Sequence, residues 1–213
     1  MRLLQSALIA VFAVCVCHAE SNWKMVSGEL SVIKKIKGDF DRDNKYSVLS
    51  YNTVSGEVRY LNPSFGTSEI NDSWTVLRQP QQTRGSFEMV FAEHTLIKGI
   101  NPGSVDGQSL YSAFLLDKSN GMVWRLVATL GERDMAMKWM QLPMPAAEGN
   151  AEWSMSGAKY SIMELGNGKV DRENIYALFL LETNGGNMYR IETHYYPSEG
   201  KISDKLIPVS AHK

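Results

Sequence analysis

The sequence contains little cysteine: of its 213 residues only Cys15 and Cys17 are cysteines, and both lie within the first 19 residues. This segment has Arg2 near its start, then an apolar stretch, and it ends at Ala19. That is the pattern of a secretory signal peptide (residues 1–19) cleaved after the alanine. Residues 20–213 then lack cysteine, which excludes a disulfide framework, a Cys–His nucleophile pair and a thiolate metal site.

The sequence also lacks a second long apolar segment and a block of one charge. The apolar part of the leader is shorter than the about 20 residues that a membrane helix requires. Basic and acidic residues nearly balance, with a formal net charge of −1, so nucleic acid is not an expected partner. We expect an exported protein, periplasmic or secreted and of bacterial type, with no membrane span after cleavage. An uncleaved anchor and a lipoprotein signal are the alternatives.

Histidines are few, and the usual catalytic motifs are missing. Of four histidines, His94 and His194 lie away from the chain ends, and they are not at metal-ligand spacing. There is no Gly-x-Ser-x-Gly elbow and no phosphate-binding glycine loop. Paired carboxylates hydrolyse sugar polymers, and the candidates here are Glu88, Glu93 and Glu164. The sequence therefore predicts a non-enzymatic protein, with an envelope-polymer hydrolase as a third possibility.

What the chain does contain is a repeat with a period of 65 residues. Four columns hold one residue type at three equally spaced positions. They are Gly38, Gly103 and Gly168; Asp41, Asp106 and Asp171; Tyr46, Tyr111 and Tyr176; and Gly56, Gly121 and Gly186. Trp74 and Trp139 keep the spacing, and the third repeat has Asp204 in that column. The pattern predicts a single domain over 20–213, with repeats at about 23–80, 81–145 and 151–210.

Each repeat is predicted to form β-strands. In the second repeat an apolar run at 111–116 leads into Asp117-Lys-Ser-Asn-Gly121 and then into Met122-Val-Trp-Arg-Leu126. This is a strand, a tight turn and a strand, with glycine at a left-handed position and the aspartate bonding turn amides. Two further strands per repeat give about four, or about twelve in all. No segment after the leader has a long helical period, so the predicted fold class is all-β.

The segment from Phe114 to Arg125 resembles the middle hairpin of quinoprotein-type β-propeller blades. In those blades an apolar strand ends in an acid, a Thr/Ser-Gly turn follows, and an aromatic-bearing strand returns. The resemblance implies blade-like geometry and brings no quinone-binding residues, so no cofactor is expected from it. Three four-stranded repeats fit a propeller-like closure, although propellers usually have about four to eight blades. A trefoil-like closure and the pairing of two chains to complete a ring are the alternatives.

The aspartate column is the strongest polar feature. Asp41 belongs to an acidic run, and alternating acids bind calcium through their oxygens. A complete calcium loop needs a glycine and a glutamate where this run has Asn44 and Ser50. An aspartate before a strand also caps a turn through backbone hydrogen bonds. We expect the column to cap turns, with a calcium site at Asp41, Asp106 and Asp171 as the alternative.

Methionine is concentrated around Trp139, as Met135, Met137, Met140 and Met144. Thioethers select Cu(I), and a tryptophan ring can cap such an ion. However, the segment has no histidine, and Met135, Met137 and Trp139 alternate as one face of a strand does. Packing is the main expectation, and copper binding is the alternative.

Arg125 and Arg190 share a column with Tyr60 and stand beside Trp124 and Tyr189. Arginine beside an aromatic residue is typical of interfaces. It is equally typical of a fold interior, where the arginine stem covers a ring. Both interpretations of the column are open at this point.

The segment from Ile97 to Leu110 is longer than its counterparts and rich in proline and glycine, which predicts a loop. A rigid repeat scaffold with a variable loop is a common way to present a binding surface, and a solvated connection is the alternative. The candidate surface consists of Asn101, Pro102, Gly103, Asp106 and Gly107.

The leading functional prediction is an exported, non-enzymatic β-repeat protein that binds another macromolecule, most simply a protein. It would be a periplasmic accessory or a secreted interaction protein. A protein that binds a small ligand or a metal, calcium before copper, is the alternative.

Overall fold

The structure, a computed structural model, consists of β-strands joined by turns in all the residues that it describes. The described residues are 22–36, 40–65, 69–80, 85–101, 104–131, 135–144, 151–166 and 169–210. They contain no helix of the length and apolarity needed to cross a membrane. The all-β prediction is confirmed, while the leader lies outside the described residues.

The described residues form twelve strands, which follow one another in three groups of four that we call units 1, 2 and 3. Unit 1 contains β1 (Trp23–Lys35), β2 (Asp41–Asn52), β3 (Val58–Phe65) and β4 (Ile70–Leu77). Unit 2 contains β5 (Phe87–Asn101), β6 (Ser104–Asp117), β7 (Met122–Leu130) and β8 (Met135–Gln141). Unit 3 contains β9 (Trp153–Gly166), β10 (Lys169–Glu182), β11 (Met188–Tyr196) and β12 (Lys201–Val209). Within each unit, consecutive strands pair antiparallel.

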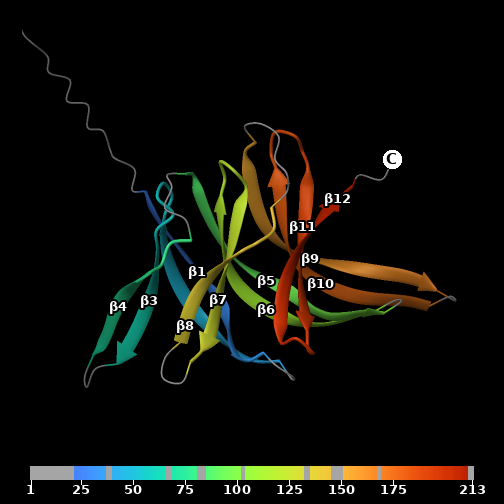
Figure 1. Cartoon of the computed structure of the whole chain (residues 1–213), viewed down its shortest axis with the longest axis horizontal. Coiled ribbons are helices and arrows are strands. Elements are labelled where there is room, and N and C mark those ends of the chain that lie inside the picture. Colours follow the sequence, from blue (N-terminus) through green and yellow to red (C-terminus); the bar gives the residue numbers. More distant parts are fainter. Residues whose placement is uncertain are drawn as a thin grey trace, which may run out of the picture.

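Short parallel pairings join the units into one open, mixed sheet. Strand β1 of unit 1 pairs with β7 of unit 2, and β5 of unit 2 pairs with β11 of unit 3. The path through the sheet begins at β4 and ends at β9. Figure 1 shows the units side by side, with the blue and teal unit 1 on the left and the orange and red unit 3 on the right. The described sheet is not closed, so neither the propeller-like nor the trefoil-like arrangement is confirmed, and the number of repeats stays a prediction.

The second and third strands of each unit are joined by a tight turn whose chemistry is visible in the sequence. Gly56, Gly121 and Gly186 have φ angles of 70, 73 and 72°, a region that glycine enters without steric cost. In unit 2 the Asp117 carboxylate accepts a hydrogen bond from the backbone N–H of Ser119 at 3.1 Å. The predicted strand–turn–strand of this segment is therefore confirmed.

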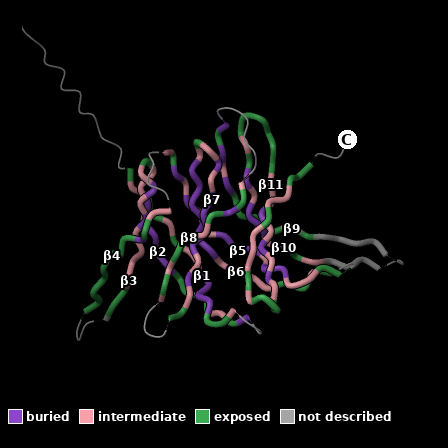
Figure 2. Tube along the Cα trace, in the orientation of Figure 1, coloured by how far each residue is buried: buried purple, intermediate pink, exposed green. Residues whose placement is uncertain are grey.

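The hydrophobic core lies mainly at the boundaries between units. One cluster joins units 1 and 2 and includes Leu30 and Leu115. A second joins units 2 and 3 and includes Leu116 and Trp153. A third takes buried residues from all three units, namely Ile33, Phe40, Leu96, Leu110 and Tyr195. In Figure 2 the buried segments fill the middle of the molecule, and exposed segments lie at the outer ends of the hairpins.

The β11–β12 hairpin departs from the fixed repeat spacing. Asp204 of β12 lies opposite Thr193 of β11. The residues opposite the corresponding positions of units 1 and 2 are Asp72 and Met137. The sequence column that places Asp204 with the tryptophans of the other repeats is therefore wrong by two residues, because the strand register changes in this hairpin.

Candidate functional site

A buried polar network joins unit 2 to unit 3. Arg125 of β7 forms an ion pair with Asp204 of β12 at 3.0 Å, and each side chain is 2% exposed. Asp204 also accepts a hydrogen bond from the Thr193 hydroxyl at 2.7 Å. Burial lowers the pKa of Arg125 from its ordinary value, while Asp204 opposes that shift. Because a buried charge is tolerated only when it is paired, this contact fixes how the two units meet.

His94 of β5 extends the network toward β6. Its Nδ1 lies 3.1 Å from the Thr193 hydroxyl oxygen, and its Nε2 lies 3.0 Å from the Ser112 hydroxyl oxygen. Since the Thr193 hydroxyl donates to Asp204, its oxygen accepts from Nδ1–H, and Nε2 accepts from Ser112. Burial lowers the pKa of His94 well below its usual range, and nearby Arg125 adds to this effect, so the ring is neutral.

Ser112, His94 and Asp204 have the residue types of the nucleophile, base and acid of a hydrolytic triad, but their burial excludes that chemistry. Ser112 is 4% exposed and His94 is 2% exposed, so a substrate cannot reach the hydroxyl. In addition, the Thr193 hydroxyl stands between the histidine and the aspartate. The network instead satisfies buried polar groups at the boundary between units.

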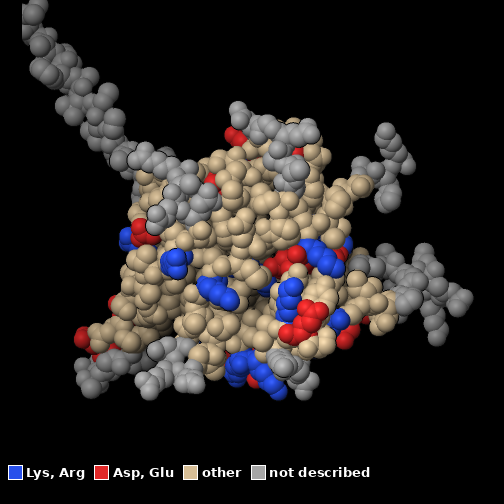
Figure 3. Space-filling model, in the orientation of Figure 1, with Lys and Arg blue, Asp and Glu red and all other residues tan. Residues whose placement is uncertain are grey.

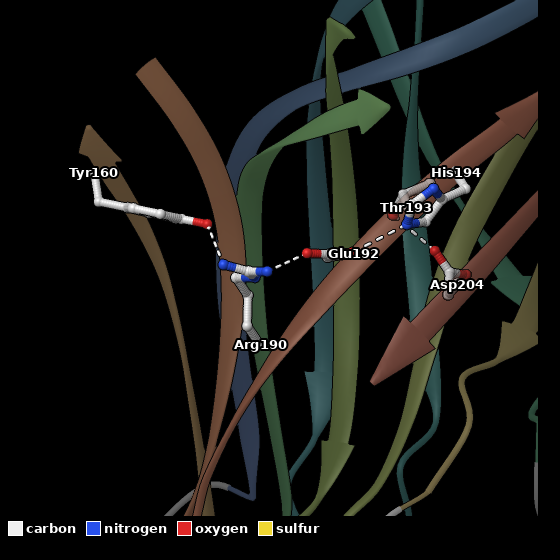
Figure 4. Close-up of polar contacts among 6 residues, drawn as sticks. All are labelled: Tyr160, Arg190, Glu192, Thr193, His194 and Asp204. Carbon is white, nitrogen blue, oxygen red and sulfur yellow. Dashed lines mark hydrogen bonds and ion pairs between the residues drawn. The ribbon is translucent and has the colours of Figure 1, made fainter. Parts of the chain in front are cut away.

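A second polar network lies on the opposite face of β11. Its residues Arg190, Glu192 and His194 alternate along the strand with the inward-facing residues. Arg190 donates to the Tyr160 hydroxyl at 2.9 Å and pairs with Glu192. His194 donates through Nε2 to Glu192 at 3.0 Å. Figure 4 shows this second network beside the Thr193–Asp204 contact. Burial raises the pKa of Tyr160, and Arg190 opposes that rise.

The second polar network borders a cavity of about 130 Å³, which we call the end cavity. Residues of units 2 and 3 line it, and most are apolar. They include Ile97, Ile100, Val105, Tyr160, Ile175 and Arg190. Small-molecule pockets measure about 300–1,000 Å³. The end cavity therefore has room for one or two side chains.

The prediction of a loop between Ile97 and Leu110 is wrong, because the described residues of this segment form the outer part of the β5–β6 hairpin. Gly107 lies opposite Ile97, and Asp106 lies opposite Gly99. A Cβ on Gly107 would lie 2.6 Å from the Thr95 side chain. This glycine therefore reflects the close approach of a neighbouring side chain within a strand, which the sequence pattern cannot distinguish from a turn.

Two of the candidate surface residues, Asn101 and Asp106, directly adjoin residues that line the end cavity. Asn101 ends β5 and is exposed, while Pro102 and Gly103 lie outside the described residues. Ile100 and Val105, which flank this tip, line the cavity. Binding at this hairpin stays a prediction, and the apolar residues that line the cavity were not among the candidates.

The aspartate column does not form one site in the residues described. Asp41 is the first residue of β2, whereas Asp106 lies inside β6, so the turn-cap prediction is wrong for Asp106. Each lies opposite an irregularity in the neighbouring strand. The side chain of Asp171 lies outside the described part. Among described side chains, no group of three His, Cys, Asp or Glu is placed to hold a metal ion.

The methionine segment packs as its alternation predicts. Met135, Met137 and Trp139 contact the cluster that joins units 1 and 2. Met140 leaves the opposite face of β8, and Met144 follows the strand. Met135 and Met137 leave the same face of β8 and border one pocket beside unit 1, so core packing accounts for them, and copper binding stays an alternative.

The candidate hydrolytic carboxylates are not brought together in the described structure. Glu88 and Glu93 are an odd number of residues apart on β5, so their side chains leave opposite faces of the strand. The side chain of Glu164 lies outside the described residues. A glycosidase needs two carboxyl groups across one sugar bond, and the described pair, Glu88 and Glu93, does not supply that arrangement.

The two arginines of the column lie in different surroundings. Arg125 is internal, and Arg190 borders the end cavity. Sequence reasoning missed the networks around both. Asp204 gave only a misleading signal, since the column of tryptophans places it two residues away from its structural position. Ser112 and Thr193 gave none, because single hydroxyl residues are common in strands.

Neither charge nor likeness to known proteins identifies a partner. On the face shown in Figure 3, basic and acidic side chains are intermixed, and neither sign forms a separate patch. This agrees with the formal net charge of −1. No model of a protein family matches the chain, and neither a curated protein nor a solved structure matches it.

Proposed function

We propose that the chain is an exported, non-enzymatic β-repeat protein that binds another macromolecule, and that it binds at the end cavity of unit 3. The observation that carries the proposal is the cavity itself, an apolar hollow of about 130 Å³ bordered by Tyr160, Arg190 and Glu192. This volume suits a side chain of a protein partner better than a cofactor or a substrate.

The composition of the site supports a protein partner. Aromatic residues and arginine are enriched in the centres of protein interfaces. Tyr160 and Arg190 form such a pair at 2.9 Å. Ile100 at the cavity rim is 65% exposed, so its apolar side chain is accessible to a partner.

The remaining parts of the proposal rest on the sequence. The leader and the absence of cysteine after it support export to a periplasm or to the outside of the cell. The four columns of identical residues, together with the same antiparallel pairing in each unit, support three copies of one 65-residue repeat.

Site-specific photocrosslinking in cells tests the proposal. A photoreactive residue replaces Ile100 at the cavity rim, and a control protein carries it at Val54, an exposed residue of the β2–β3 turn. We expect a crosslinked protein in near-equal amount with the chain from the first position only. Equal yields from the two positions, or no product from Ile100, would refute binding at the end cavity.

A further inference from the structure

A filled counterpart of the end cavity exists inside the chain. The end cavity is bordered by Ile97 of β5 and by Ile175 and Arg190 of unit 3. One unit earlier, strand register and spacing place Ile33, Leu110 and Arg125 at these positions. The two sites therefore share one framework, and only the earlier one is occupied.

The β11–β12 hairpin of unit 3 is the occupant of the filled site. Tyr195 and Ile202 pack in the cluster that contains Ile33 and Leu110. The Tyr195 hydroxyl donates to the backbone carbonyl of Ile36 at 2.7 Å. From the same hairpin, Asp204 pairs with Arg125 at 3.0 Å. This kind of site thus takes a hairpin that supplies apolar side chains and one aspartate.

Unit 1 carries a hairpin of the same design in β3–β4. Ile70 lies opposite residue 65 as Ile202 lies opposite residue 195, and Asp72 lies opposite residue 63 as Asp204 lies opposite residue 193. Ile70 is 66% exposed, and Asp72 is also exposed. Figure 1 shows β3–β4 projecting at the end of the molecule away from unit 3, so it cannot reach the end cavity of its own chain.

A second recurring contact links the turn of one unit to the first residue of the next. A Cβ on Gly56 would lie 2.9 Å from the Phe87 ring, and one on Gly121 would lie 2.7 Å from the Trp153 ring. On Gly186, at the end of unit 3, a Cβ would meet nothing within 4 Å. Trp23, at the start of β1, holds in unit 1 the position of these two aromatic residues.

Unit 1 exposes an apolar side chain at a position that is buried in the other two units. Met25 is 70% exposed, whereas its counterparts Met89 and Met155 are 3% and 6% exposed because a preceding unit covers them. At the other end of the molecule, Leu181 and Met188 are each 36% exposed. Their counterparts in unit 2, Leu116 and Val123, are buried under unit 3.

We propose that the end cavity binds a second copy of this chain, whose unit 1 stacks on unit 3 as units stack within one chain. Ile70 of the second copy enters the cavity, and its Asp72 pairs with Arg190. This inference rests on the proposed function, since it names the partner of the same site. The contact joins two different surfaces, so it produces either a ring or an open filament.

The contact between copies is weaker than the contacts within a chain. Ser50 of unit 1 stands where units 2 and 3 have Leu115 and Leu180. Pro63 stands where unit 2 has Ala128, and it has no N–H for the short parallel pairing that joins units. Association is therefore reversible and depends on concentration.

Two exposed substitutions, one on each surface, test the proposal. Ile70→Glu prevents the hairpin from entering a cavity, and Ile100→Glu prevents the cavity from accepting a hairpin. Val54→Glu is the control. All three positions are exposed in the described structure, so the fold is retained. Sedimentation velocity of the purified chain without its leader, at up to about 0.5 mM, detects association weaker than micromolar.

We expect the wild type and Val54→Glu to associate with rising concentration and each isoleucine variant to remain monomeric. A mixture of the two variants keeps one intact contact and forms heterodimers only. If either variant fails to fold, Met25→Glu replaces the first and Met188→Glu replaces the second. A monomeric wild type, variants that associate like the wild type, or a mixture that stays monomeric would overturn the inference.

The two proposals fail in different ways. If the wild type is monomeric and Ile100 crosslinks another protein in cells, the end cavity binds that protein and self-association is wrong. If the wild type is monomeric and Ile100 crosslinks nothing, both proposals are wrong.

Discussion

Removing the carboxylate of Asp204 is expected to destabilise the chain strongly. The Asp204→Ala change leaves Arg125 buried without its ion-pair partner, because the two side chains are only 2% exposed and 3.0 Å apart. It also removes the acceptor of the Thr193 hydroxyl. Breaking one side of a buried pair costs about 3–5 kcal/mol. Since a folded domain is stabilised by about 5–15 kcal/mol, the loss is a large part of the total.

Urea unfolding and thermal melting measure this loss. For a chain of this size, about 3–5 kcal/mol corresponds to a fall in Tm of roughly 6–20 °C. Asp204→Asn is the matched control, since it keeps an acceptor for Thr193 and removes only the charge. It should lose less stability than Asp204→Ala.

A double substitution separates the pair from its surroundings. Replacing Arg125 and Asp204 together by methionine and leucine removes both charges, which is often neutral or stabilising. We therefore expect the double variant to recover most of the stability that Asp204→Ala loses. A loss below about 1 kcal/mol for Asp204→Ala would show that Arg125 reaches water and would refute the reasoning.

Two further predictions concern His94 and the turn glycines. The pKa of His94 is lowered in the folded state, so below its unfolded value of about 6.5 the unfolded chain binds more protons. Stability should thus fall as the pH drops from about 6.5 toward the folded pKa, by up to about 1.4 kcal/mol per pH unit. His94→Gln should flatten this slope in urea titrations, and an unchanged slope would contradict the assignment. Gly121→Ala and Gly186→Ala place a Cβ at φ of 73 and 72°, at a cost of about 1–2 kcal/mol each. Only the first meets the Trp153 ring, at 2.7 Å, so urea unfolding should show a further loss of about 1–3 kcal/mol; equal losses would refute the contact.

The features that the sequence predicts correctly are those whose causes are local. Asp117 and Gly121 define a tight turn through their own backbone geometry, so the β6–β7 hairpin is predictable. The alternation of Met135, Met137 and Trp139 likewise predicts the face of β8 that packs on the core.

The features that sequence reasoning missed have distant causes. Gly107 is needed because the Thr95 side chain approaches it across the strand pair, so a glycine that marks a turn elsewhere lies in a strand here. His94 bonds to Thr193, 99 residues away, and Arg125 bonds to Asp204, 79 residues away. No local pattern reports such pairs, and the change of register in β11–β12 also misplaced Asp204.

Arg190 at the free end of unit 3 is charge-balanced within its own unit, which Arg125 of unit 2 is not. Arg190 holds the position of Arg125, whose charge is balanced by an aspartate from the next unit. At the free end Glu192 supplies that balance from the same strand. The corresponding residue of unit 2 is Val127, which packs in the third cluster under unit 3. A carboxylate at this one position keeps Arg190 paired while the end is open. In the complex that we propose, Asp72 of the second copy would lie beside a guanidinium that Glu192 already pairs in the free chain.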